Sequence, residues 1–360
     1  MTRQPIHTRL LELEVRRGKI GELLVNGTIC DLRKQGFVPT GGDLQVSGLI
    51  HNMGIQALVD RENRKLLSIE PSQTVVAYEA SEVTDGESCR DIGWRLRGTK
   101  DKHLDGNFVG KLAGEFGGRL GCTHLLSLTQ LLPSTLDRAL AWESSLVAGD
   151  APGEASRERG ERIFKRSIVF DGYEFSDREE MEVIVQLNDV HTTPQQDVTN
   201  ALERFARQFE VQLWARVGMP NLQLTSIRGR EREREEMPLD RGGWRDLAED
   251  LSALHGCRTL EGLGREVIGL LGGEVTARPL RDALLTIAPG MIQCMAVKVR
   301  HMIERGDGED SEPNSTALLG AQPDSCYIWR ADGPGRRRSE ARWAAIGAKA
   351  REPIGGEESE

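Results

Sequence analysis

The string Cys122-Thr123-His124 brings three chemically active residue types to the predicted start of a helix. Thr123 is a natural N-cap, so Cys122 comes just before the first turn, where unpaired backbone N–H groups and the helix dipole favour a thiolate. A cysteine with a lowered pKa is a nucleophile or a metal ligand, and His124 could orient or deprotonate a bound group. The alternative is a buried cysteine beside a helix cap, because cysteine is among the most buried residue types.

Two more histidines stand at predicted strand starts: His51 precedes the third strand and His7 the first. If those strand starts and the helix start lie at the same end of the fold, both imidazoles converge with His124. Each could instead be a loop histidine without a chemical role. The candidate catalytic residues are therefore Cys122, His124, His51 and His7, with the histidines as acid, base or ligand groups.

A metal site is a second interpretation of these residues. Thiolate and imidazole are good ligands for zinc or iron. The candidate ligands are Cys122, His124, His51, Cys89 and Cys326. Their spacing follows no standard metal motif, so the sequence leaves the cofactor open, with a divalent metal as one option.

An internal repeat divides the chain into two similar units. Residues 54–59 resemble residues 210–215, a shift of about 156 positions, which is typical of tandem duplication. At nearly the same shift, Gly114 and Gly117-Gly118 answer Gly269 and Gly272-Gly273. Such a repeat separates two kinds of residue, because what both units keep is needed for the fold and what one unit keeps is a candidate for function.

The second unit lacks the thiol and the imidazoles of the first. It has Thr276-Ala277-Arg278-Pro279 at the helix start, and Arg207 in place of His51. Asp31 and Asp189, in contrast, end equivalent predicted strands. Because both units keep this carboxylate, we expect a structural role at a turn rather than a catalytic one.

The fold class that these patterns predict is α+β, with two tandem units, each an antiparallel sheet packed with helices, related by a pseudo-twofold axis. In the first unit we expect strands over residues 7–15, 21–31, 54–60 and 65–79, a loop over 36–43, and helices over 107–115 and from 123 onward. In the second we expect strands over 167–173, 181–189, 210–217 and 222–228, an added helix over 198–209, and helical segments over 244–271 and 279–304. The domain boundaries are 1–147, a linker over 148–162, the second unit over 163–305, a closing segment over 306–334 and a disordered tail over 335–360.

Composition limits the classes of function. The chain has 360 residues and a net charge of -9, which argues against nucleic acid as a partner because phosphate binding needs a basic surface. An apolar run long enough for a transmembrane helix is missing, and the N-terminal residues do not resemble a signal peptide, so we expect neither a membrane partner nor export. The six cysteines are scattered, which suits reduced thiols in the cytoplasm.

Three motifs of the first unit resemble a bacterial family known only as domain of unknown function 2889. They are His7-Thr8-Arg9, Ile50-His51-Asn52-Met53 and Gly121-Cys122-Thr123-His124-Leu125; Asp31, Asp60, Cys89, and Cys326 with Asp332-Gly333, also match the family pattern. The resemblance covers most of residues 5–142 and a short stretch at 324–334. The chain departs from the family in being longer than its usual single-copy members, and in having Asn52 where they have Asp. The resemblance implies a cytoplasmic bacterial protein near catabolic pathways for small organic acids or aromatics, and it implies no particular reaction.

Two classes of function follow. The first is an enzyme of small-molecule catabolism that works through the Cys/His site of the first unit. The second is a non-catalytic binding protein or accessory subunit that holds a small ligand or a partner chain. The second unit would then complete the pocket or replace a homodimer partner, and the sequence leaves homo-oligomers open.

Overall fold

The computed structural model describes most of the chain. The described residues are 2–40, 43–146, 157–175, 179–195, 205–219, 221–235, 243–260, 262–272, 278–297, 324–333 and 336–337. The predicted linker core at 148–156, residues 306–323 of the closing segment and nearly all of the predicted tail lie outside these ranges. Among the described helices, none is long and apolar enough to cross a membrane.

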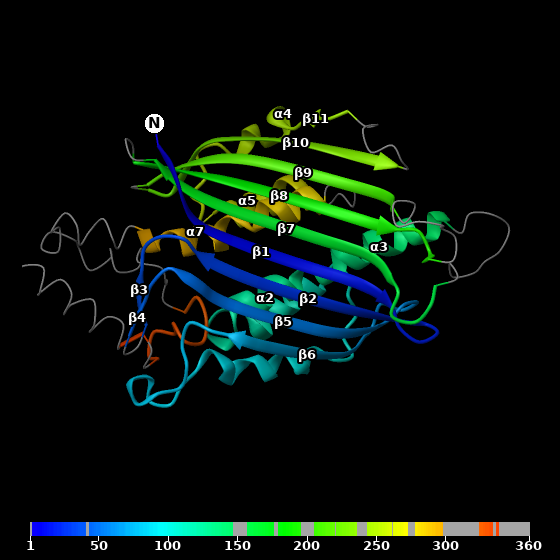
Figure 1. Ribbon diagram of the computed structural model, residues 1–360, viewed down its shortest axis with the longest axis horizontal. Helices are drawn as coiled ribbons and strands as arrows, with labels where there is room; N and C mark the ends of the chain where they lie inside the picture. Colours follow the sequence, from blue (N-terminus) through cyan, green and yellow to red (C-terminus); the bar gives the residue numbers. More distant parts are fainter. Residues whose placement is uncertain are drawn as a thin grey trace, which may run out of the picture.

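One antiparallel sheet runs through the whole molecule, and the helices cover one of its faces (Figure 1). The strand order is β11-β10-β9-β8-β7-β1-β2-β5-β6. The strands are β1 (Arg3–Arg17), β2 (Glu22–Arg33), β5 (Gly48–Asp60), β6 (Leu66–Val75), β7 (Arg162–Phe175), β8 (Glu180–Thr192), β9 (Phe205–Gly218), β10 (Gln223–Glu235) and β11 (Arg245–Asp246), with a separate hairpin of β3 (Val38–Thr40) and β4 (Asp43–Gln45). The α+β class is confirmed, but the two predicted units share one sheet instead of each having its own.

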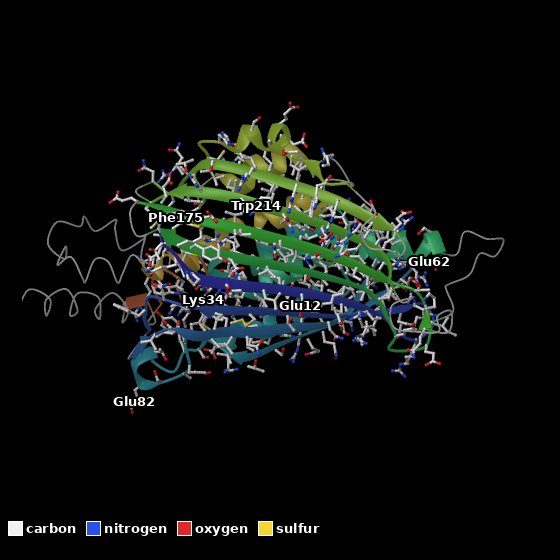
Figure 2. All side chains as sticks on the ribbon, turned by 45° about the horizontal axis from the view of Figure 1, so that its top comes forward. Glu12, Lys34, Glu62, Glu82, Phe175 and Trp214 are labelled. Carbon is white, nitrogen blue, oxygen red and sulfur yellow. The ribbon has the colours of Figure 1, made fainter. Side chains whose placement is uncertain are left out.

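The alternation of side chains explains why one face is covered. Along β1, Leu11, Leu13 and Val15 are buried, whereas the intervening Glu12 and Glu14 are partly exposed. This period of two is what a strand with one buried face requires. Charged and polar side chains such as Glu12 accordingly stand on the open face (Figure 2).

The helices lie in two groups of similar order. In the first half of the chain (residues up to 146) these are η1 (Glu82–Thr84), η2 (Cys89–Thr99), α1 (Phe108–Phe116), η3 (Gly118–Leu120), α2 (Thr123–Gln130) and α3 (Leu132–Leu146). In the second half (157–297) they are α4 (Ala248–Leu251), η6 (Ser252–Leu254), α5 (Leu263–Leu271), α6 (Arg278–Leu285) and α7 (Ile287–Cys294). Helix α2 packs on β2 and β5, while α3 and α7 both pack on the central strands β1 and β7.

The prediction of one long helix from Thr123 was wrong, because the helix breaks at Leu131. Pro133 follows two residues later. Its ring removes a backbone donor and collides with the carbonyl four residues earlier, so a straight helix cannot continue through it. The break lets α2 lie over β2 and β5 and α3 turn toward β1 and β7.

The two halves pair their strands in mirrored order about the β1–β7 contact. Leu11 lies opposite Ile168 there, and the register on both sides of this pair is symmetric. Arg9 faces Asp31 across β1 and β2, as Arg166 faces Asp189 across β7 and β8, so equivalent positions are 157 and 158 residues apart. The register shift at Leu58/Val59 recurs at Arg216/Val217, again 158 positions later.

The structural shift differs from the shift of about 156 in the sequence. On β5 and β9 the residue equivalent to His51 is Phe209, which faces Asp189, and not Arg207. The helix expected over 198–209 was also wrong in its described part, since residues 205–209 belong to β9. Residues 196–204 lie outside the described part of the chain. The segment 244–271, expected to be helical, begins with β11 and contains only short helices before α5.

Candidate functional site

Three neighbouring strands bring five ionisable side chains to the helix-covered face of the sheet. The register pairs His7 with Arg33, Arg9 with Asp31, and Asp31 with His51. Residues two apart on a strand point to the same face, so His7 and Arg9 stand beside Asp31 and Arg33. All five are buried, and we call them, together with His124, the first-half cluster.

Asp31 is the centre of the first-half cluster and has no exposed surface. The Arg9 guanidinium donates to both of its oxygens, from Nε to Oδ1 at 2.7 Å and from Nη2 to Oδ2 at 3.0 Å. His7 Nε2 forms a hydrogen bond with Oδ1 at 2.9 Å. This carboxylate is therefore held in one orientation from the β1 side, with Oδ2 turned toward β5 and α2.

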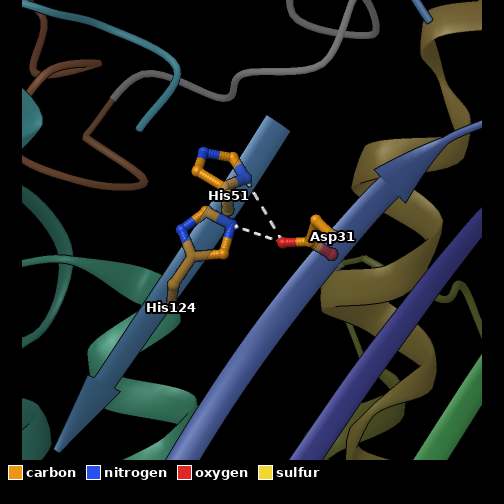
Figure 3. Close-up of side chains that lie close together, drawn as sticks. All are labelled: Asp31, His51 and His124. Carbon is orange, nitrogen blue, oxygen red and sulfur yellow. Dashed lines mark ion pairs between the residues drawn. The ribbon is translucent and has the colours of Figure 1, made fainter. Parts of the chain in front are cut away.

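Two imidazoles approach Asp31 Oδ2 from the other side (Figure 3). His51 Nδ1 lies 3.3 Å and His124 Nε2 3.1 Å from this oxygen, and the two ring centroids are 3.8 Å apart. Neither nitrogen makes a hydrogen bond of acceptable geometry within the described residues, although both are buried. Both nitrogens therefore lie close to the carboxylate oxygen without the alignment of a hydrogen bond.

The distances of both imidazole nitrogens from Asp31 Oδ2 fit a shared metal ion. Ligand atoms about 2.0–2.2 Å from a metal at angles of 90–110° lie roughly 3.0–3.5 Å from one another. The two distances to Asp31 Oδ2 fall in this interval, and all three ligand atoms lie within 4.8 Å of one another. Two histidines and one carboxylate are the ligand set of many iron(II) and zinc enzymes.

The protonation states suit ligands as well. Burial by itself would raise the pKa of Asp31, but the Arg9 guanidinium and the three imidazoles outweigh it and hold this pKa well below its usual value. Burial and the neighbouring His51 lower the pKa of His124 to about 3. Near neutral pH the site thus presents a carboxylate and a neutral imidazole, the forms that bind metals.

Cys122 lies at the edge of the site but does not have the activated thiolate that the sequence predicted. Burial raises the pKa of its thiol, and the backbone N–H groups at the start of α2 oppose this only in part. Cys122 itself is the N-cap of α2, whereas Thr123 is the first helical residue. Its Sγ lies 3.9 Å from His124 Nδ1 and 3.8 Å from Met53 Sδ, so the thiol contacts the outer side of the His124 ring.

The segment of residues 324–333 reaches back from beyond the second half and packs on the first. Its contacts are Tyr327 N–H donating to Gly121 O (2.9 Å), Thr123 Oγ1 donating to Ser325 O (2.6 Å), and an ion pair of Arg330 with Glu87. This places the thiol of Cys326 near those of Cys89 and Cys122, and burial keeps all three pKa values above normal. The Cys326 segment therefore packs on the first half.

A pocket opens above the first-half cluster. Including its mouth to solvent, it measures about 930 Å³. It is lined by residues from β2, β5, the start of α2, the segment 324–333 and, from the second half, α7. All five predicted metal ligands (Cys122, His124, His51, Cys89 and Cys326) line it, while His7 lies behind Asp31.

The structure brings two of those five residues together and places beside them Asp31, which the sequence had not suggested as a ligand. Within the described residues His51 and His124 converge with Asp31, and the cysteines do not join them at one point. Asp31 had been taken for a turn residue, yet it lies within β2, and His51 lies within β5, not before it. The alternation His7-x-Arg9 and Asp31-x-Arg33 is the signal that could have indicated a buried charged cluster.

A comparison with known protein families finds one match, in the first half of the chain. Residues 7–137 match the family described as Protein of unknown function (DUF2889). The match supports the resemblance to that family over the first half, including the whole first-half cluster. No curated protein and no solved structure matches the chain.

Proposed function

We propose that this protein is an enzyme that holds one divalent metal ion on Asp31, His51 and His124 and acts on a small organic molecule in the pocket above it. One observation carries the proposal: two buried imidazole nitrogens lie 3.1 and 3.3 Å from the same carboxylate oxygen, without the alignment of a good hydrogen bond among the described residues. Buried polar atoms rarely stay unsatisfied, so the close approach of these nitrogens to one carboxylate oxygen supports a bound ion.

The surrounding residues would support such an ion. Arg9 and His7 fix the orientation of the Asp31 carboxylate, as outer partners of metal ligands usually do. Cys122 contacts His124 on Nδ1, which leaves Nε2 to face the metal. When bound, a divalent transition metal would activate a coordinated oxygen atom as a Lewis acid, and an iron(II) ion would add redox chemistry.

Two further proposals concern the origin and location of the chain. A tandem duplication is supported by the mirrored strand order and by the register shift that recurs after 158 positions. The second half then completes the pocket through α7. A cytoplasmic location is supported by the free thiols of Cys89, Cys122 and Cys326, which share one pocket without forming a disulfide.

The test is the metal content of the full chain, purified without chelators and measured by native mass spectrometry and elemental analysis. We expect about one ion per chain in the wild type. We expect its loss in His51→Gln, His124→Gln and Asp31→Asn, because each removes one of only three protein ligands. His191→Gln, which changes a buried histidine of the second half, is the matched control and should keep the ion.

If the folded wild type is isolated without metal, it is titrated with iron(II) under argon, and with zinc and manganese. Stoichiometric uptake that raises Tm, absent in the three ligand variants, would still support the site. A wild type that takes up none of these ions, or ligand variants that bind like the wild type, would refute it. The non-catalytic binding protein would then be the better interpretation.

A further inference from the structure

The pocket carries an excess of buried positive charge. Arg9 and Arg33 line it together with two histidines, and its described lining contains neither aspartate nor glutamate. Asp31, beneath the lining, is the one carboxylate among the described residues in ion-pair contact with the cluster. Two permanent cations therefore face a single anion, even before a divalent metal adds to the imbalance.

Among the described residues, Arg33 is the cation of this pocket that forms no ion pair. Its side chain is almost fully buried, and Nη1 donates to the backbone and side-chain oxygens of Gln45, at 2.9 and 3.1 Å, both of them neutral. Nε is buried and makes no hydrogen bond within the described part of the chain. No hydrogen bond among the described residues occupies the Nε–Nη2 edge of Arg33, which is the edge that Arg9 uses on the Asp31 carboxylate.

The remaining walls of the pocket are mostly apolar. They include Met53, Ile92, Ile292, Ile328 and Trp329. Trp329 meets Tyr78 edge to face, with ring centroids 5.7 Å apart. A site with apolar walls and one open guanidinium edge fits a ligand with an apolar body and one planar anionic group.

We propose that the pocket binds a small carboxylate with an apolar body, and that Arg33 holds the carboxylate in a bidentate pair beside the metal. This inference rests on the proposed function for the position of the metal, while the charge imbalance is present without it. The carboxylate removes the cost of a buried, unpaired guanidinium, and the apolar body displaces water from the walls.

Calorimetric titration of the zinc-loaded full chain tests the ligand class. The probes are benzoate, phenylacetate and 3-phenylpropionate, their primary amides, and inorganic phosphate. We expect at least one carboxylate to bind ten-fold or more tightly than its amide, and Arg33→Gln to remove this preference. Arg97→Gln, which changes an exposed arginine paired with Glu70, is the matched control and should leave it intact. Equal binding of acids and amides, or a preference for phosphate alone, would overturn the proposal.

A ligand-free measurement separates a binding arginine from a structural one. A buried arginine without an anionic partner destabilises the ligand-free protein, so Arg33→Met should leave Tm unchanged or raise it. Arg166→Met, which removes a buried arginine whose partners are all present, should lower Tm. A comparable drop in both variants would show that Arg33 is structural. Metal content measured on the same samples distinguishes failure of the carboxylate site from failure of the metal site.

Discussion

Arg9–Asp31 in the first half and Arg166–Asp189 in the second occupy matching places in the sheet, yet their surroundings differ. Around Asp31 stand three histidines and Arg33. At the places of His7 and His51 the second half has Phe164 and Phe209, and Pro279 stands one residue into α6, as His124 does in α2.

The N–H groups of Arg166 in the second pair are hydrogen-bonded more completely than those of Arg9 in the first. Arg166 donates to Asp189 through Nε and Nη2, both at 2.7 Å, and through Nη1 to Asp282 and Ser134. Arg9 has only Asp31, and its Nη1 is buried without a hydrogen bond in the described structure. The shared pair holds neighbouring strands together in both halves, and the arginine of the first pair keeps one buried N–H group unsatisfied among the described residues.

The largest effect is expected from breaking the second pair. Arg166→Met leaves Asp189 and Asp282 buried without their main cation, which should lower the free energy of unfolding by about 3–5 kcal/mol. Arg9→Met leaves one buried carboxylate without its arginine, but three imidazoles still contact that carboxylate. The decrease in the free energy of unfolding should therefore be smaller. Urea unfolding of the metal-free proteins at neutral pH, followed by circular dichroism, measures both; a larger loss for Arg9→Met would contradict this account.

Exchanging equivalent residues between the two halves should lower the free energy of unfolding by different amounts. Phe209→His removes apolar contacts and the ring that lies 4.2 Å beneath the Arg138 guanidinium, and should cost about 2–3 kcal/mol. His51→Phe replaces a side chain that borders the pocket and whose Nδ1 makes no hydrogen bond, so the metal-free protein should lose less than about 1 kcal/mol. The same unfolding assay decides, and equal costs would mean that the two sites are packed alike.

The smallest effect concerns pH. His191 takes the place in the second half that Arg33 takes in the first. Burial lowers the pKa of His191, and its hydrogen bond to Glu143 opposes this only in part. Below about pH 6.5 the unfolded chain binds a proton at His191 while the folded protein keeps this residue neutral. The contribution of His191 to the free energy of unfolding is therefore fully present above pH 6.5 and is lost on acidification.

The free energy of unfolding should decrease less steeply in His191→Gln than in the wild type between about pH 6.5 and 5. The difference in slope is at most about 1.4 kcal/mol per pH unit for one proton. Unfolding free energies of wild type and variant across this range provide the measurement. Parallel curves would mean that His191 is protonated in the folded protein. Arg33 keeps its charge over the whole range, because burial lowers its pKa only to about 10.

The sequence predicted most strands because alternation within a strand is a local property. It could not predict that β1 would pair with β7 and join both halves in one sheet, since alternation says which face is buried and not which strand is the neighbour. For the same reason residues 205–209 looked helical although β8 and β10 enclose them as a strand.

The candidate site was predictable in part. The Cys122–His124 string and His51 indicated the right region, because loss from one unit of a repeat is visible in the sequence. Asp31 was set aside because both units keep it, yet a residue can brace the sheet in both halves and also serve a site in one. The raised pKa of Cys122 depends on burial, which no pattern around residue 122 reports.

The bond between Thr123 and Ser325 spans 202 positions, and this separation sets an order in time. Ribosomes add about 5–20 residues per second, so the strands and α2 of the first half emerge roughly 10–40 s before the segment that roofs their pocket. During this interval the nascent chain presents the Asp31 carboxylate and its histidines to the surrounding solution, open on the side that is later covered. An ion or ligand that enters the pocket of the complete protein slowly would therefore reach it through a wider opening before residues 324–333 have been synthesised.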